Sequence, residues 1–159
     1  MIKKNFYNLP IIVFIFILDR ITKIYILSLS NNTGELDVSI APFLNLNLIW
    51  NEGIAFGLLS ITESIYYNLI TLLILLITAA ILWMVFKSEG LEKKAFLMIF
   101  GGSLGNIYDR IYYSAVPDFI DIHVNNFHWF IFNVADIFIT IGVIILIVLE
   151  IFKKNDKKY

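Results

Sequence analysis

Four stretches of this sequence are apolar over about the length needed to cross a lipid bilayer: residues 9–28, 65–86, 95–113 and 131–152. A helix needs about 20 mostly apolar residues to cross a hydrocarbon core roughly 30 Å thick. The whole chain fits this pattern, because 59% of its residues are hydrophobic and only 16% are charged, against about 25% in an ordinary soluble domain. We therefore expect an all-α membrane protein with four transmembrane helices.

The basic residues outside these runs indicate how the chain is oriented. Nine of the 12 Lys and Arg residues lie before the first run, between the second and third, or after the fourth: Lys3, Lys4, Lys87, Lys93, Lys94, Lys153, Lys154, Lys157 and Lys158. Such residues favour the cytoplasmic side, so four spans place both termini in the cytoplasm. The first run carries Asp19, Arg20 and Lys23 and has no convincing cleavage site, so we interpret it as a retained helix rather than a signal peptide.

Two segments remain for the outer face, residues 29–64 and 114–130. Apolar and polar residues alternate in LDVSI (Leu36–Ile40) and in LNLNL (Leu44–Leu48), with Ala41-Pro42 between them. A period of two is typical of half-buried strands. We expect a small sheet on the membrane surface, and no second domain within residues 1–159.

The segment NEGIAFGLLS (Asn51–Ser60) follows these strands. Gly53 and Gly57 allow tight backbone turns, and Asn51 offers both a hydrogen-bond donor and an acceptor. Four apolar residues are expected to dip into the membrane interface: Ile54, Phe56, Leu58 and Leu59. A loop that simply returns to the membrane would explain the same residues.

Charged residues inside the apolar runs need an explanation, because a charge at the bilayer centre costs about 2.5–3.5 kcal/mol on insertion scales. In LDRITK (Leu18–Lys23), Asp19 and Lys23 are four residues apart and can pair on one face of a helix. A structural ion pair that joins the first span to its neighbours accounts for both residues at least as well as a functional role.

A second polar group lies in GGSLGNIYDRI (Gly101–Ile111). Gly101 and Gly105 form a GxxxG pair, which more often indicates close helix packing than function. Three residues at intervals of four share one helical face, with Asp109 beside them: Gly102, Asn106 and Arg110. The alternative for Asp109 and Arg110 is a solvated helix end.

Two acids come from VPDFIDI (Val116–Ile122) and FNVAD (Phe132–Asp136). Asp118 follows the third run and Asp136 starts the fourth, so both are expected at a similar depth near the outer surface. Asp136 is also explained as an acid that complements the helix dipole. Asp118 is also explained as an ordinary surface acid, with Asp121 as the neighbour most easily confused with it.

The polar residues of these segments converge on the outer half of the protein: Lys23, Asn51, Asn106, Arg110, Asp118, Asn133 and Asp136. The chain has no Cys and only two His residues, so cysteine nucleophiles are excluded and a metal site or cofactor is not expected. Two carboxyl groups held close together share one proton and can activate water. A Ser–Lys mechanism through Lys23 ranks lower, because Asp19 lies one turn away and no serine is obviously placed beside it.

LDRITK, NEGIAFG, GGSLGNIYDRI, VPDFID and FNVAD occur in this order along nearly the whole chain. Together they resemble the lipoprotein signal peptidases (type II), which are bacterial membrane aspartyl proteases. The resemblance implies four transmembrane helices, a β-cradle and a loop on the outer face. It also implies cleavage of the signal peptide of a diacylglyceryl-modified prolipoprotein, immediately before the lipidated cysteine.

The resemblance assigns Asp118 and Asp136 as the catalytic dyad, and eight residues as the ones that bind substrate or support the site: Asp19, Lys23, Asn51, Gly53, Asn106, Asp109, Arg110 and Asn133. It implies an inner-membrane monomer with lipids and the prolipoprotein as partners, and neither nucleic acid nor a cofactor. The chain departs from the family pattern at Pro117, at Ser114-Ala115 where glycine is common, and at Ile137 where Ser or Thr is frequent.

Two other classes of membrane protein would also keep charges inside their spans or have several spans. A transporter or channel tends to place polar groups along the whole crossing path. The inner halves of the runs 65–86 and 131–152 are instead Ile and Leu, with almost no polar residue before Glu150. A non-catalytic adaptor explains the spans but not two convergent carboxylates.

Overall fold

The computed structural model describes residues 9–33, 36–53, 63–125 and 127–156. Its helices are α2 (Leu9–Thr33), α3 (Glu63–Lys87), α4 (Gly90–Tyr113) and α5 (Val134–Asp156). Its strands are β1 (Asp37–Ala41), β2 (Leu44–Asn51), β3 (Val116–Val124) and β4 (Phe127–Phe132). Each apolar run of the sequence therefore contributes a helix. The expected small sheet is present and has four strands, so the label all-α is too narrow for this chain.

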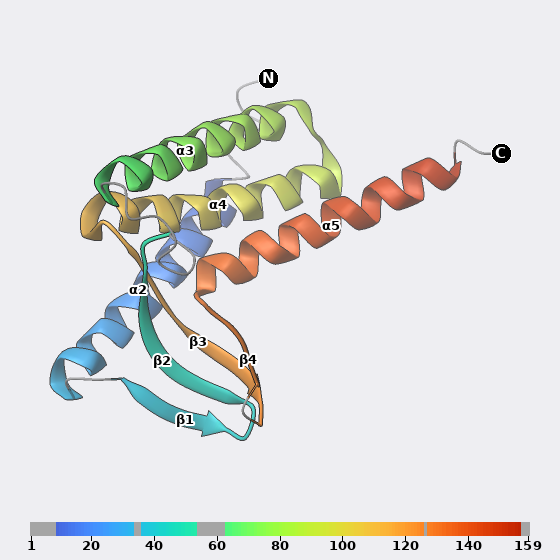
Figure 1. Ribbon diagram of the computed structural model, residues 1–159. Coiled ribbons are helices and arrows are strands. Elements are labelled where there is room, and N and C mark those ends of the chain that lie inside the picture. Colours follow the sequence, from blue (N-terminus) through green and yellow to red (C-terminus); the bar gives the residue numbers. More distant parts are fainter. Residues whose placement is uncertain (1–8, 34–35, 54–62, 126, 157–159) are drawn as a thin grey trace.

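Helix α4 is the centre of the bundle and contacts α2, α3 and α5 (Figure 1). Its glycines allow this close approach, because no side chain separates the backbones. A Cβ on Gly101 would lie 3.2 Å from the Cβ of Ile15 on α2, and a Cβ on Gly105 would overlap Asp19 of the same helix. The expectation that the GxxxG pair serves helix packing is confirmed.

Gly102→Ala is expected to lower the free energy of unfolding by about 1–3 kcal/mol, the usual effect of overpacking. The new Cβ would lie 2.6 Å from the carbonyl oxygen of Ala135 and 2.8 Å from Cγ1 of Ile139. Since the first of these atoms is backbone, α5 itself would have to shift. Thermal unfolding of the purified protein in detergent measures the effect. Gly101→Ala is the control, because its nearest neighbour is a side chain at 3.2 Å. Equal losses in both variants would contradict this explanation.

The strands form one antiparallel sheet in the order β1-β2-β3-β4, which extends from one end of the bundle with β1 at its outer edge (Figure 1). The two strands expected from alternation are confirmed, and their turn lies at Pro42-Phe43. Residues 116–132 were not expected to form strands. Along Val116–Phe119 every residue is buried, so no alternation of apolar and polar residues marks β3 in the sequence.

One face of the sheet packs against the end of α2. Ile26 of α2, Leu36 and Phe119 of β3 form a small buried cluster, and partly buried Leu46 and Leu48 of β2 pack on it. The apolar side of the alternating strand β2 therefore faces this core. Strand β4 leads directly into α5 (Figure 1), so the fourth helix begins at Val134 rather than at residue 131.

The bundle has an apolar exterior and a charged interior. Large apolar side chains are exposed along α3 and α5: Leu69, Leu72, Leu73, Leu76, Ile77, Ile141, Ile144, Ile147 and Ile151. By contrast, Asp19, Lys23 and Asp109 are at most 1% exposed. Among the described residues, Tyr67–Lys87 and Val134–Lys153 are long and apolar enough to cross a membrane, judged by length and composition. This distribution is the reverse of that in a soluble protein.

The loop expected over the outer face has its apolar residues at Ile54, Phe56, Leu58 and Leu59. These positions, with Gly57, lie outside the described residues.

Candidate active site

Four charged side chains join α2 to α4, three of them buried and the fourth, Arg20, half-buried. Lys23 Nζ lies 3.0 Å from Asp19 Oδ1 and 2.6 Å from Asp109 Oδ2. Arg20 Nη2 lies 2.7 Å from Asp19 Oδ2 and 2.7 Å from Asp109 Oδ2. Two acids and two bases therefore balance each other inside the bundle. The expected Asp19–Lys23 pair is confirmed, whereas a solvated helix end is wrong for Asp109, which is 0% exposed.

Arg20 is the residue of this cluster that sequence reasoning did not assign to the site. The sequence does contain an indication of its role, because Arg20 is a third charged residue inside the apolar run 9–28. Its partner Asp109 is 89 residues away in the chain, and only the packing of α2 on α4 brings the two together. The guanidinium also lies 4.7 Å from the ring centre of Tyr108, a distance suited to a cation–π contact.

The cluster fixes the orientation of Asn106. Lys23 donates its third hydrogen bond to Asn106 Oδ1 at 2.9 Å. Because the amide oxygen faces the ammonium group, the amide nitrogen faces the other way, and Asn106 Nδ2 donates to Asp136 Oδ1 at 2.8 Å. All three described hydrogen-bond partners of Lys23 are thus side chains of Asp19, Asp109 and Asn106. No serine is among them, which weighs against a Ser–Lys mechanism.

Asp136 is held by the first turn of α5. The backbone N–H of Asp136 donates to Asn133 Oδ1 at 3.2 Å, and the backbone N–H of Asn133 donates to Asp136 Oδ2 at 3.1 Å. This reciprocal pair is a capping box with Asn and Asp in place of the usual Ser and Glu. The backbone N–H of Ala135 donates to Asp19 Oδ1 at 3.1 Å. Asp136 is therefore a helix N-terminal acid, and the same bonds aim its carboxyl group.

Asp118 lies on β3 and is 4% exposed. Asn51 Nδ2 donates to its Oδ2 at 2.9 Å, and Asn133 Nδ2 donates to its Oδ1 at 2.6 Å. Asn51 is oriented by the backbone N–H of Gly53, which donates to Asn51 Oδ1 at 2.8 Å. Gly53 has φ +81°, a conformation that glycine adopts without strain. The end of β2 thus holds an amide donor against the first acid.

Asn133 connects the two acids, because its side chain binds Asp118 and its backbone N–H binds Asp136. The pKa of Asp118 is raised to about 6, chiefly by burial and also by the charge of Asp136, although the hydrogen bonds from Asn51 and Asn133 act in the opposite direction. Two carboxyl groups in this relation favour a state with one proton between them.

Arg110 lies beside the site. Its Nη1 would be 3.2 Å from a Cβ on Gly53, and its backbone oxygen accepts a hydrogen bond from the Tyr67 hydroxyl at 2.6 Å. Its Nε and Nη1 are buried and have no hydrogen-bond partner in the described structure. A cation with buried donors that lack a partner is suited to bind a carbonyl or carboxylate oxygen.

The structure brings together all ten residues that the sequence assigned. Five form the contacts of the acid pair: Asn51, Asn106, Asp118, Asn133 and Asp136. Three belong to the ion cluster behind Asn106: Asp19, Lys23 and Asp109. Gly53 and Arg110 lie at one side. Asp121 is buried too, but its carboxylate lies 2.8 Å from His128 Nδ1 and does not join the site.

Within residues 9–33, 36–53, 63–125 and 127–156, no group of three or more His, Cys, Asp or Glu side chains is arranged to hold a metal ion.

Known proteins resemble this chain over nearly its whole length. The signal peptidase (SPase) II family matches residues 11–152. A lipoprotein signal peptidase of Pelagibacter ubique (strain HTCC1062) is 59% identical over 97% of this chain and 93% of its own length. One from Anaplasma phagocytophilum (strain HZ) is 35% identical over 96% and 97% of the two chains. A bacterial membrane enzyme solved by the in meso method at 2.3 Å resolution matches with a TM-score of 0.74 and 30% identity, over 95% of this chain and 91% of its own.

Proposed function

This chain belongs to the signal peptidase II family, and on that premise we propose that Asp118 and Asp136 are its catalytic pair. The protein is a bacterial membrane protease that removes the signal peptide from lipid-modified prolipoproteins. Cleavage falls immediately before the diacylglyceryl-modified cysteine. The observation that carries the assignment of the pair is the double contact of Asn133, which holds Asp118 through its side chain and Asp136 through its backbone.

In the proposed reaction, ionised Asp136 takes a proton from a water molecule while protonated Asp118 donates a hydrogen bond to the scissile carbonyl oxygen. The water oxygen bonds to the carbonyl carbon, and Asp118 passes its proton to the former carbonyl oxygen, which becomes a hydroxyl of the tetrahedral intermediate. As the C–N bond breaks, Asp136 gives its proton to the amine of the modified cysteine, and Asp118 takes a proton back from one hydroxyl. This leaves a carboxyl group on the signal peptide and restores the starting state of the pair. The raised pKa of Asp118 supports its role as the protonated member. No covalent enzyme intermediate is needed.

Asn51 and Arg110 are proposed to hold the peptide backbone of the substrate. Asn51 is exposed at the end of β2, where an extended peptide can reach it. Arg110 has two buried donors, Nε and Nη1, without a partner in the described structure, and Nη1 lies beside Gly53, so a substrate carbonyl would give one of them the hydrogen bond that it lacks.

We further propose that all four helices cross the inner membrane, with both termini in the cytoplasm and the site near the outer face. The charges of α2 and α4 are no obstacle, because they pair inside the bundle. The basic residues outside the helices favour this orientation. We expect a monomer surrounded by membrane lipids, since all ten proposed site residues come from one chain.

The pH dependence of cleavage tests the proposed pair. With a lipidated precursor in detergent, kcat/KM is expected to be highest with the singly protonated pair and to fall about tenfold per pH unit above about 6. The sign follows because burial raises the pKa of Asp118, so this acid keeps its proton below pH 6 and loses it above.

Asn51→Ala provides the internal control for that profile. Asn51 donates to the carboxylate of Asp118, so its loss removes a bond that lowers the pKa, and the falling limb should move to higher pH. A kcat/KM that instead rises through pH 6 would make Asp118 the base and reverse the proposed roles.

A further inference from the structure

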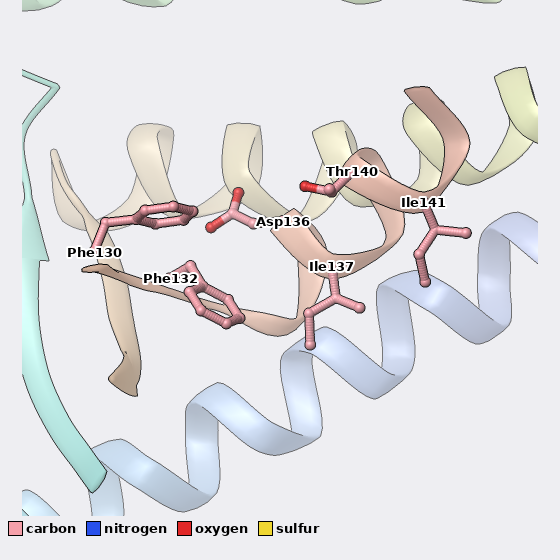
Figure 2. A pocket seen from close by; sticks show the side chains of 6 residues that line it. All are labelled: Phe130, Phe132, Asp136, Ile137, Thr140 and Ile141. Carbon is pink, nitrogen blue, oxygen red and sulfur yellow. The ribbon is translucent and has the colours of Figure 1, made fainter. Parts of the chain in front are cut away.

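Two hydrogen bonds aim the carboxyl group of Asp136 in the described structure, and both come from asparagine residues. Asn106 Nδ2 donates to its Oδ1 at 2.8 Å, and the backbone N–H of Asn133 donates to its Oδ2 at 3.1 Å. Figure 2 shows the carboxyl group beside the ring of Phe130, at a cavity whose lining is hydrocarbon apart from Asp136 and Thr140. The direction of this acid therefore depends on where its two donors lie.

Asp19 of α2 holds the backbone at the start of α5. The N–H of Ala135, the residue before Asp136, donates to Asp19 Oδ1 at 3.1 Å. The first N–H groups of a helix have no partner within it, so this buried carboxylate satisfies one of them. The bond fixes the first turn of α5 against α2, and with it the backbone that carries Asp136.

Asp109 of α4 reaches the same acid by a longer route. Its Oδ2 lies 2.6 Å from Lys23 Nζ, and Lys23 donates to Asn106 Oδ1 at 2.9 Å. Because Lys23 holds the amide oxygen, the amide nitrogen is turned toward Asp136. One route therefore ends at the backbone before Asp136, and the other ends at its carboxyl group.

Arg20 joins the starting points of both routes. Its Nη2 lies 2.7 Å from Asp19 Oδ2 and 2.7 Å from Asp109 Oδ2, and its Nη1 also bonds to Asp109 Oδ1. The rings of Tyr108 and Phe16 lie 4.7 Å and 5.9 Å from its Cζ, which suits cation–π contacts. The guanidinium has no described contact with the catalytic pair, so its effect on the reaction passes through the two acids that it binds.

We propose that Arg20 is a positioning residue, whose fork of donors holds Asp19 and Asp109 in the orientation that aims Asp136. This inference rests on the proposed catalytic pair. A residue that only balanced charge would be replaceable by lysine. A residue that positions two carboxylates at once would not be, because an ammonium group is a point charge and lacks the rigid, bidentate fork of a guanidinium.

Arg20→Lys separates these two roles, because it keeps the charge and removes the fork. With a lipidated precursor in detergent, kcat is expected to fall about 10- to 100-fold, since displacement of a reacting group by about 1 Å costs up to about 100-fold. KM should stay near the wild-type value, because the described contacts of Arg20 are all with the protein itself. Thermal unfolding of the same preparation shows whether the variant is folded.

The backbone amide of Ala135 gives a readout that does not depend on turnover. Without the fork, Asp19 is free to turn, so the Ala135 N–H should exchange with solvent deuterium faster in Arg20→Lys than in the wild-type protein. The amide of Ile144, in the middle of the same helix, is the internal control and should exchange at the wild-type rate.

Tyr108→Leu is the matched control variant. It removes a ring beside the guanidinium but none of the bonds from Arg20 to Asp19 and Asp109. It should unfold at a lower temperature than the wild-type protein and keep a kcat and an exchange rate at Ala135 near the wild-type values.

A second comparison serves if Arg20→Lys does not fold. Arg20→Gln/Asp109→Asn replaces one ion pair by neutral groups, which costs little stability, and leaves Lys23 to balance Asp19. Asp109→Asn alone retains Arg20 on Asp19. The double variant should have the lower kcat of the two, and equal values would overturn the inference.

A wild-type kcat in folded Arg20→Lys would overturn the inference, because Arg20 would then supply charge alone. Unchanged exchange at Ala135 would overturn it too, because Asp19 would then hold α5 without the fork. An equal loss of kcat in Tyr108→Leu would also overturn it, since the effect would then follow stability.

These results would leave the aspartate pair in place. Failure of the pair itself would appear as full cleavage by Asp118→Asn or Asp136→Asn, and both of these variants retain Arg20.

Discussion

Asp118→Asn and Asp136→Asn are each expected to lower kcat/KM on a lipidated precursor by about 10³-fold, within the range for loss of a general acid or base. Asparagine has nearly the same size as aspartate but cannot take up or release a proton at these pH values. A gel-shift assay on purified precursor measures the loss. Full cleavage by either variant would remove that residue from the mechanism.

The double variant should be no slower than either single variant, because the two acids act as one unit and their effects are not additive. Asp121→Asn is the matched control. Asp121 lies three residues from Asp118 on the same strand and is also buried, but alternation along a strand turns it to the opposite face, where it binds His128. Its substitution should leave cleavage near the wild-type rate.

Thermal unfolding separates a catalytic loss from a folding defect. Burial raises the pKa of Asp118, so the ionised carboxylate costs stability above about pH 6 and a neutral amide does not. Asp118→Asn removes this cost but sets its own amide nitrogen against one of the two donors, Asn51 or Asn133. The two effects oppose each other, so the variant is expected to unfold near the wild-type temperature in buffers above that pH.

The sequence identifies the helices through their apolar runs and identifies β1 and β2 through alternation. It does not reveal β3, because Val116–Phe119 is buried on both faces and a fully buried strand lacks a period of two. The fourth helix begins later than its apolar run, because Phe127–Phe132 pairs with β3 as a strand first. Local pattern cannot separate a buried strand from the start of an apolar helix.

The motifs of the sequence predict which residues belong to the site, but they do not predict most of the contacts between these residues. The capping box is local, since Asn133 and Asp136 are three residues apart, and an N-x-x-D spacing before an apolar run signals it. The contact of Arg20 with Asp109 depends on how α2 packs against α4. For the same reason, the sequence places Lys23, Asn106 and Asp136 in one region but does not show that the Asn106 side chain forms a hydrogen bond with each of the other two.

The ion cluster behind Asn106 gives the other large expected effect. Lys23→Met should lower the free energy of unfolding by about 3–5 kcal/mol, the usual result of breaking a buried charge pair. It leaves Asp19 and Asp109, both 0% exposed, with Arg20 as their shared cation. Thermal unfolding in detergent measures this loss. Lys153→Met is the control, because Lys153 forms an exposed pair with Glu92 and should have no measurable effect.

Lys23→Met should also reduce cleavage through Asn106, whose oxygen is held by the ammonium group while its nitrogen donates to Asp136. The double variant Lys23→Met/Asp109→Asn separates the two roles. In this double variant Asp19 is the one acid of the cluster that remains, and Arg20 balances its charge. Stability should therefore recover in part, because a buried ion pair can be replaced by neutral groups at little cost. Asn106 still has no cation to orient it, so kcat should stay low. If cleavage returned together with stability, Lys23 would act only through charge balance, and the orienting role of its bond to Asn106 would be wrong.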